Sequence, residues 1–330
     1  MKEFNALRAP FKIYGVPLFE QNGMMERIPR SLREKVPSLA DLGRRTPGAR
    51  LAFRTDSAHI GLTIHFEKIS VDIGMAIYAC QSASVYAGGR YLGLVCAPNY
   101  STPRAEGLLE KRPVMEDVMI YLPRNEVITG ITVALDDGAA VEAPTPYAHP
   151  VPVVFYGSSI TEGAHPSMQS NAYTALLSRW LDVDFVNLGF SGAARGELDV
   201  ADFINTLNMS AFVLDYDHNA PSPEHLAATH EPFFLRIREK HPDLPILILT
   251  KPDADYRDTA PRLAVIRATY ENALRAGDKN VWFIDGATFF GDTDRDACSA
   301  DTVHPNDLGM YRMAQTIRPL LAEMLGIADR

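Results

Sequence analysis

The sequence predicts an α/β protein of two domains: an all-β sandwich over residues 1–148, then a three-layer α/β/α sandwich with a five-stranded parallel sheet over residues 149–330. Three observations lead to this prediction. Short β-branched stretches dominate the first half, a Pro-rich segment (EAPTPYAHPVP, residues 142–152) follows them, and strand-length apolar runs then alternate with stretches at helical spacing. A chain of 330 residues has room for two domains of ordinary size.

The first half has the pattern of a β-sandwich. Gly, Pro, Asn and Asp turn signals separate its candidate strands, which include LAFRTDSAHIGLTIHF, SVYAGGRYLGLVCA, DVMIYLP and VITGITVALDD. Within residues 51–66, the apolar side chains fall on one face, as a half-buried strand pair requires; they are Leu51, Phe53, Ile60, Leu62, Ile64 and Phe66. The first fifty residues are rich in Pro and charge, which predicts irregular structure wrapping the sandwich.

The second half alternates strands and helices five times. The predicted strands are Val151–Tyr156, Phe185–Leu188, Ala211–Asp215, Pro245–Leu249 and Val281–Asp285. The last helix has one apolar stripe with Asn306 or Asp307 as its N-cap; the stripe contains Met310, Met313, Ala314, Ile317, Leu320, Leu321 and Met324. This alternation indicates a parallel sheet covered by helices on both faces, with any active site at the carboxyl ends of the strands.

A serine follows the first predicted strand, in the segment Phe155–Gly163. Ser159 stands there on a tight, glycine-framed turn between strand and helix, which exposes its hydroxyl and aims nearby backbone N–H groups at any oxyanion formed on it. Such a position is typical of a serine nucleophile. The alternative is that Ser159 only caps the helix, a common use of serine.

Three further loops supply polar groups at the same edge of the sheet. Gly192, after the second strand, allows close backbone approach and would donate its N–H to the oxyanion, unless it is a simple turn glycine. Asn219, after the third strand, would aim its side-chain NH₂ at the same oxygen. Asp301 and His304 lie three residues apart before the last helix, where the carboxylate can orient the imidazole and Pro305 restricts the backbone. Together these loops predict one site.

The order of these motifs resembles the four sequence blocks of the SGNH (GDSL-type) hydrolase superfamily. The resemblance covers residues 151–330 and rests on Gly157-Ser158-Ser159-Ile160-Thr161, Gly192, Asn219 and Asp301-x-x-His304. It implies a flavodoxin-like sheet and a catalytic triad of Ser159, Asp301 and His304. It also implies an oxyanion hole formed by Ser159, Gly192 and Asn219.

The chain departs from the family pattern in two places. Gly-Ser-Ser stands at residues 157–159 in place of Gly-Asp-Ser, and Tyr-Asp-His-Asn stands at residues 216–219 in place of Gly-x-Asn-Asp. The upstream half resembles the jelly-roll-like accessory domain that precedes one branch of these enzymes, several of which look like carbohydrate esterases. The resemblance therefore implies an esterase that removes a short acyl group, such as acetyl, from a carbohydrate or related small molecule. The same triad would also serve an acyltransferase.

Three other interpretations remain open at this point. The segment Gly189–Ala193 nearly matches the G-x-S-x-G elbow of α/β-hydrolases, with Ser191 as the nucleophile. Asp215, Asp217 and His218 are residue types that bind metals, although a hydrogen-bonded loop that shapes the pocket explains them more simply. A protein of a different class would bind carbohydrate through an inactive hydrolase domain, but the presence of all three triad residue types disfavours it.

Composition excludes several partners. The formal net charge is 32 − 41 = −9, and the sequence has no block of basic residues that would bind nucleic acid. Its three widely spaced cysteines have the spacing of neither a disulfide framework nor a zinc site. No P-loop or dinucleotide fingerprint is present, so we expect no cofactor and no metal. The amino terminus lacks a signal-peptide layout and no apolar run is long enough to span a membrane, which predicts a cytoplasmic protein. The expected partner is a small-molecule or saccharide ester; self-association into a homo-oligomer remains open.

Overall fold

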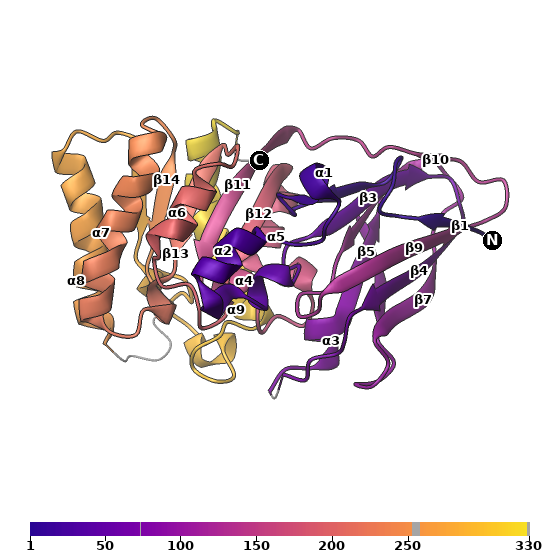
Figure 1. Ribbon diagram of the computed structural model, residues 1–330, viewed down its shortest axis with the longest axis horizontal. Helices are drawn as coiled ribbons and strands as arrows, with labels where there is room; N and C mark the ends of the chain where they lie inside the picture. The colour runs from indigo at the N-terminus through magenta and orange to yellow at the C-terminus, as the bar shows by residue number, and fades with distance from the viewer. Residues whose placement is uncertain (73, 253–257, 329–330) are drawn as a thin grey trace. The chain divides into compact units, whose positions relative to one another are not determined.

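The computed structural model describes residues 1–72, 74–252 and 258–328 (Figure 1). The chain forms two compact units. Unit 1 comprises Met1–Arg27, Gly43–Ala148 and Ser167–Ser170, and unit 2 comprises Ile28–Leu42, His149–Pro166 and Asn171–Arg330. Two short segments, residues 28–42 and 167–170, therefore belong to the unit on the other side of the predicted boundary at residue 148.

Unit 1 is built on one antiparallel sheet of ten strands. Along the sheet the order is β1-β9-β4-β7-β6-β5-β8-β3-β10, and β2 pairs with β3. The strands are β1 (Lys2–Asn5), β2 (Lys12–Tyr14), β3 (Arg50–Thr55), β4 (His59–Phe66), β5 (Ser82–Ala87), β6 (Arg90–Cys96), β7 (Arg104–Glu110), β8 (Glu116–Tyr121), β9 (Ile128–Leu135) and β10 (Val141–Glu142). Short helices α1 (Phe19–Asn22) and α3 (Ile77–Gln81) lie between strands of this unit. The predicted all-β accessory domain is confirmed.

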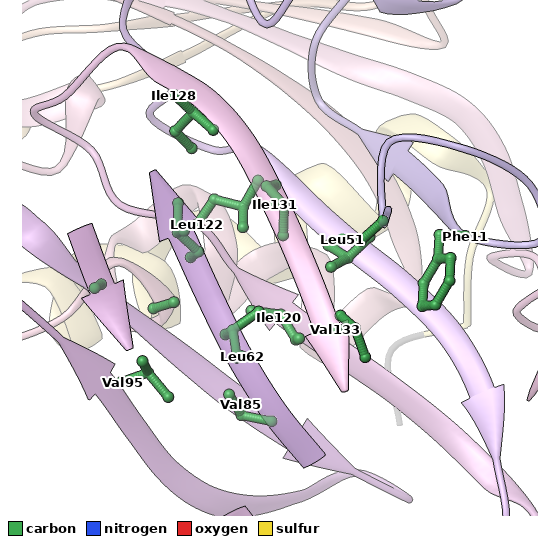
Figure 2. Close-up of a cluster of buried hydrophobic side chains, with 14 of the residues drawn as sticks. Phe11, Leu51, Leu62, Val85, Val95, Ile120, Leu122, Ile128, Ile131 and Val133 are labelled. Atoms are coloured by element: carbon green, nitrogen blue, oxygen red, sulfur yellow. The ribbon is translucent and has the colours of Figure 1, made fainter. Parts of the chain in front are cut away.

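The six apolar residues predicted to share a face all belong to the core of unit 1. Figure 2 shows Leu51 and Leu62 in this core, together with side chains from several other strands. The expected pairing of the two strands that carry them is wrong, because β3 pairs with β2, β8 and β10 whereas β4 pairs with β7 and β9. An apolar face predicts burial but does not select the neighbour, which here comes from distant parts of the chain.

The first fifty residues are more regular than predicted. Strands β1 and β2 join the sheet of unit 1 through antiparallel pairing with β9 and β3. Helix α2 (Arg30–Lys35) lies in the segment that belongs to unit 2. Strands of three or four residues are too short to give a clear alternating pattern, so their sequence resembles a loop.

Unit 2 confirms the predicted five-stranded parallel sheet. Its strands are β11 (His149–Gly157), β12 (Val183–Gly189), β13 (Ala211–Asp215), β14 (Ile246–Leu249) and β15 (Val281–Ile284), in the order β12-β11-β13-β14-β15. The order reverses at β11, so a crevice is expected beyond the carboxyl ends of β11 and β13, where open α/β sheets bind ligands.

Two groups of helices cover this sheet (Figure 1). Helix α5 (Tyr173–Leu181) packs against α9 (Asp307–Leu325), while α7 (Pro223–Lys240) packs against α6 (Leu198–Ile204) and α8 (Thr259–Arg275). Asn306 caps α9, because its side chain accepts hydrogen bonds from the N–H groups of Leu308 and Gly309. No helix among the described residues is long and apolar enough to cross a membrane.

Candidate active site

Helix α4 (Ser159–Glu162) begins directly after β11 and lies tightly against the ends of the strands. A Cβ atom added at Gly157 would overlap the side chain of Thr161, and one added at Gly189 would overlap the backbone of Glu162. Glycine at the ends of β11 and β12 therefore allows the helical turn to approach the sheet more closely than any other residue would. This approach fixes the position of Ser159, the first residue of the turn.

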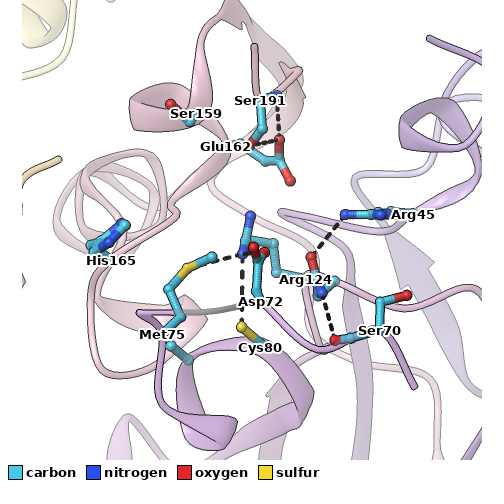
Figure 3. Close-up of polar contacts among 12 residues, drawn as sticks. Arg45, Ser70, Asp72, Met75, Cys80, Arg124, Ser159, Glu162, His165 and Ser191 are labelled. Carbon is cyan, nitrogen blue, oxygen red and sulfur yellow. Dashed lines mark hydrogen bonds and ion pairs between the residues drawn. The ribbon is translucent and has the colours of Figure 1, made fainter. Parts of the chain in front are cut away.

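Side-chain hydrogen bonds hold the same turn from three directions. The Thr161 hydroxyl donates to the Asp215 carboxylate at the end of β13 (2.7 Å), and the Asn187 amide donates to the Thr161 carbonyl (2.7 Å). The backbone N–H and the hydroxyl of Ser191 both donate to Glu162 Oε2, at 2.6 and 2.7 Å (Figure 3). The turn that carries Ser159 is thereby bound to β12, to the loop after β12 and to the end of β13.

Ser158, and not Ser159, caps helix α4. The Ser158 hydroxyl accepts a hydrogen bond from the N–H of Ile160 at 3.1 Å. The alternative interpretation of Ser159 as a simple N-cap is therefore wrong. Its hydroxyl is instead hydrogen-bonded to His304, with 2.8 Å between Ser159 Oγ and His304 Nε2.

Asp301 and His304 are joined within one short loop before α9. His304 Nδ1 lies 2.6 Å from Asp301 Oδ2, and Asp301 Oδ1 accepts the backbone N–H groups of Val303 (2.9 Å) and His304 (2.7 Å). Ser299 pairs with Pro305 across the base of the loop, and Thr302 has a φ of 66°, a strained value for a β-branched residue. The conformation of this loop thus turns the Asp301 carboxylate toward the ring of His304, three residues later.

The electrostatics of this pair fix the tautomer of the imidazole. Partial burial alone would raise the pKa of Asp301, but hydrogen bonds from the His304 ring and from the backbone N–H groups of His304 and Val303 hold it well below its usual range. The carboxylate is therefore ionised and can only accept hydrogen bonds. Nδ1 must carry the proton toward Asp301, which leaves Nε2 as the acceptor for the Ser159 hydroxyl.

A hydrogen bond joins the loop that carries Gly192 to the turn that carries Asn219. The Asn219 amide nitrogen donates to the carbonyl of Phe190 at 2.7 Å, two residues before Gly192. Phe190 in turn donates its N–H to the carbonyl of Gly157 at the end of β11 (2.9 Å). One amide hydrogen of Asn219 remains for another acceptor, and the N–H of Gly192 has no hydrogen-bond acceptor among the described residues.

A polar pocket of about 370 Å³ lies over these two residues. Its other lining residues supply mainly basic and polar groups; they are His218, Ala220, Pro221, Lys251, Asp258 and Arg262. The His218 ring also lies near the His304 ring, with 6.4 Å between centroids in an edge-to-face arrangement. The pocket therefore opens beside the loop groups that the sequence predicts to bind an oxyanion.

Comparison with known families places residues 151–322 in a described family. The model of the GDSL-like lipase/acylhydrolase family matches residues 151–322. The chain belongs to this family. As a GDSL-like protein it is an acyl-ester hydrolase or transferase, and the predicted SGNH/GDSL resemblance is confirmed.

Solved structures show the same fold over nearly the whole chain. A protein from Bacteroides ovatus named as a GDSL-like lipase is 24% identical, with 99% of this chain and 98% of that chain covered and a TM-score of 0.88. A salicylyl-acyltransferase from a tetracycline biosynthetic pathway is 21% identical, with 99% and 98% covered and a TM-score of 0.82. A family two carbohydrate esterase from Clostridium thermocellum is 15% identical, with 85% and 93% covered and a TM-score of 0.63. No match was found among curated protein sequences.

The alternative nucleophile of this GDSL-like protein, Ser191, has different surroundings. Its hydroxyl donates to the Glu162 carboxylate, whereas the hydroxyl of Ser159 is bonded to the imidazole of His304. A carboxylate that already receives two hydrogen bonds is a poor general base for serine at neutral pH. The Ser191 interpretation, which requires an α/β-hydrolase elbow, is wrong for this fold.

His165 lies in the site, and sequence reasoning missed it. Its ring is stacked on that of His304, with 4.4 Å between centroids and 11° between planes, and its Nε2 is 3.8 Å from Asp301 Oδ2. His165 stands six residues after the start of the α4 turn (165 − 159), where nothing in the local sequence indicates that it meets His304, 139 positions away (304 − 165). The stack limits rotation of the His304 ring.

His165, Asp301 and His304 form the one group of three potential metal ligands found within the described residues. Nitrogen lone pairs lie in the plane of each imidazole, and two nearly parallel rings do not aim them at a common point. A metal would require one ring to leave the stack. The metal site that the sequence suggests at Asp215, Asp217 and His218 is also disfavoured. The Asp215 carboxylate accepts hydrogen bonds from the Thr161 and Tyr173 hydroxyls, and the Asp217 carboxylate is paired with Arg262.

Two of these acidic side chains are buried and their pKa values are raised. Burial raises the pKa of Asp215 to about 7, opposed by hydrogen bonds from Thr161 and Tyr173. Burial also raises the pKa of Asp217, opposed by the backbone N–H of Lys251 and the charge of Arg262. Both carboxyl groups thus depend on neighbouring donors in the loops of the site.

The raised pKa of Asp215 predicts how stability depends on pH. Between about pH 4 and pH 7 the folded protein holds a proton on Asp215 that the unfolded chain has lost, so this group makes stability fall as pH rises through that window. In Asp215→Asn the contribution disappears. Denaturant unfolding at several pH values measures this effect. From pH 5 to pH 8, the free energy of unfolding of the variant should rise relative to that of the wild type by on the order of 2 kcal/mol. Asp292→Asn, at an exposed position, is the control, and parallel curves for Asp215→Asn would contradict the prediction.

Proposed function

We propose that the protein is a serine esterase that cleaves a carboxylic ester through an acyl-enzyme on Ser159. The observation that carries the proposal is the continuous hydrogen-bond relay from Ser159 Oγ to His304 Nε2 and from His304 Nδ1 to Asp301. This is the arrangement in which a serine hydroxyl is activated by a positioned base. Ser159 is accordingly the nucleophile, His304 the general base and Asp301 the group that orients it.

The relay accounts for each proton transfer. Ser159 Oγ attacks the ester carbonyl carbon while its proton passes to His304 Nε2. The C–O bond to the alcohol then breaks, and the alcohol leaves with the proton from Nε2. Water enters, gives a proton to His304 and attacks the acyl carbon, after which Ser159 departs and regains its proton. Asp301 stays ionised throughout and stabilises the charged imidazole.

The oxyanion is proposed to lie between the backbone N–H groups of Ser159 and Gly192 and the side-chain amide of Asn219. The N–H of Ser159 is at the start of a helical turn, where backbone donors have no partner within the helix. Within residues 1–72, 74–252 and 258–328, the N–H of Gly192 has no acceptor, and Asn219 has a second amide hydrogen to donate. Fixed donors of this kind stabilise the charge that develops in the transition state.

The substrate is proposed to be a small polar ester, such as a carbohydrate or related small molecule carrying an acetyl group. The pocket beside Gly192 and Asn219 measures about 370 Å³ and is lined by His218, Lys251 and Arg262, which suits hydroxyl-rich groups better than a long hydrocarbon chain. Structural similarity to carbohydrate esterases of family two supports the same class.

Ser159→Ala should abolish hydrolysis of p-nitrophenyl acetate, because no other hydroxyl is bonded to His304 among the described residues. We expect kcat to fall by about 10⁴-fold or more with the fold retained. The matched variant Ser191→Ala removes a hydroxyl of the same size that is bonded to Glu162, and it should keep kcat within about tenfold.

The same assay tests the substrate class. A long-chain p-nitrophenyl ester should be a poorer substrate than the acetate for the wild type. Full activity of Ser159→Ala, or loss of activity only in Ser191→Ala, would overturn the assignment. If the wild type bound glycans but cleaved no acetylated sugar or aryl ester, the protein would be a carbohydrate-binding protein instead.

Acyl transfer is the second candidate function. The similarity to a salicylyl-acyltransferase extends over 99% of this chain, and the proposed residues would serve either reaction. In transfer, the hydroxyl of an acceptor takes the place of water in the second step and gives its proton to His304. Product analysis with an activated acyl donor and polyhydroxylated acceptors separates the two: acylated acceptor in excess of free acid indicates a transferase, and free acid alone an esterase.

A further inference from the structure

We infer that Arg262 is a positioning residue for the oxyanion hole, because its guanidinium holds the turn that carries Asn219. The inference rests on the proposed function and names a residue that the sequence motifs do not include. Arg262 lies in the first turn of α8, outside the four loops from which the predicted site residues come. It acts through Asn219 and needs no contact with the substrate's reacting atoms.

The contacts of Arg262 enclose the turn from both ends. Its Nη1 donates to the carbonyl of Asp217 at 2.8 Å and lies 3.3 Å from the Asp217 carboxylate, while Nη2 donates to the carbonyl of Ala220 at 2.8 Å. Residues 217 and 220 flank the segment that contains Asn219. All these groups are buried: Arg262 is 7% exposed, and Asp217 and Ala220 are 2% exposed. Hydrogen bonds from a charged donor in such surroundings are strong and directional.

The turn itself needs this external support. Residues Asp217–Asn219 form a single 3₁₀ turn, a conformation with weaker internal hydrogen bonds than an α-helix. The Asp217 carboxylate ties it to the next strand loop by accepting the N–H of Lys251 at 2.8 Å, and Arg262 adds the bonds to its two ends. The position of Asn219 therefore depends on α8 as well as on its own loop.

Movement of this turn would disturb the proposed oxyanion hole directly. The Asn219 amide is oriented by one hydrogen bond to the Phe190 carbonyl, in the loop that also carries Gly192. A displacement of the turn would break or bend that bond and turn the remaining amide hydrogen away from the oxyanion. Displacements of about 1 Å at such groups lower rates substantially. The charged fork of arginine fits two carbonyls at once, which the single ammonium of lysine does not.

A double-mutant cycle with p-nitrophenyl acetate tests the inference. Asn219→Ala should lower kcat by about 10²-fold, the usual effect of removing one oxyanion donor. Arg262→Met should lower kcat by about tenfold or more in the wild-type background while KM changes less than about threefold, since the interaction is gained in the transition state. In the Asn219→Ala background, Arg262→Met should change kcat by less than about twofold, because the donor that it positions is already absent. Arg262→Lys provides a milder variant that keeps the charge, and it should show the same dependence on Asn219 with a smaller fall.

Arg238→Met is the matched control. Arg238 is another arginine of unit 2 whose guanidinium binds backbone carbonyls and one carboxylate, of Asp278, so its loss tests the general effect of removing such a group. Its kcat per folded molecule should equal that of the wild type. An equal fall in kcat for the Arg262 variants with and without Asn219, or no fall in either background, would overturn the inference. Activity in Ser159→Ala would instead overturn the proposed function, so the two failures are distinguishable.

Discussion

The close approach of the α4 turn to the ends of β11 and β12 is the constraint on which the rest of the site depends. Gly157 and Gly189 have no side chain to separate the turn from the sheet, so Ser159 stands at the edge where the strand order reverses. Parallel strands end at the same edge, and each following loop then adds one group to that point. Which residues come together is therefore determined by which strand ends they follow, and not by their separation in the sequence.

Buried carboxylates connect these loops to one another. Glu162 receives two hydrogen bonds from Ser191, Asp215 receives the hydroxyls of Thr161 and Tyr173, and Asp217 binds the N–H of Lys251. Each carboxylate joins a different set of segments, and none of the three belongs to the proposed relay. Burial of acidic groups is costly unless donors surround them, so these donors and acceptors have to be ordered together. The ordered loops in turn leave the Ser159 hydroxyl and the Gly192 N–H in fixed positions.

Much of this arrangement could be predicted from the sequence. Hydrophobic periodicity indicates the strands and helices, and the position of each polar motif after a strand indicates the edge of the sheet where it lies. The five apolar runs of the second half each became a strand, and Ser159, Asp301 and His304 lie in hydrogen-bond contact as the motifs indicate. His165 and Arg262 could not be predicted, since their contacts join segments that no local pattern relates. The pairing of β3 with β8 could not be predicted for the same reason. Strands β1 and β2 could not be predicted because they have too few residues to show an alternating pattern.

The most direct measurement is the site of covalent labelling by a fluorophosphonate, which reacts with a serine only when a base activates it. After digestion, mass spectrometry should find the phosphonyl adduct on the peptide that contains Ser159, and the adduct should be absent from Ser159→Ala and from His304→Ala. Labelling at Ser191, or undiminished labelling of the His304→Ala variant, would contradict the account.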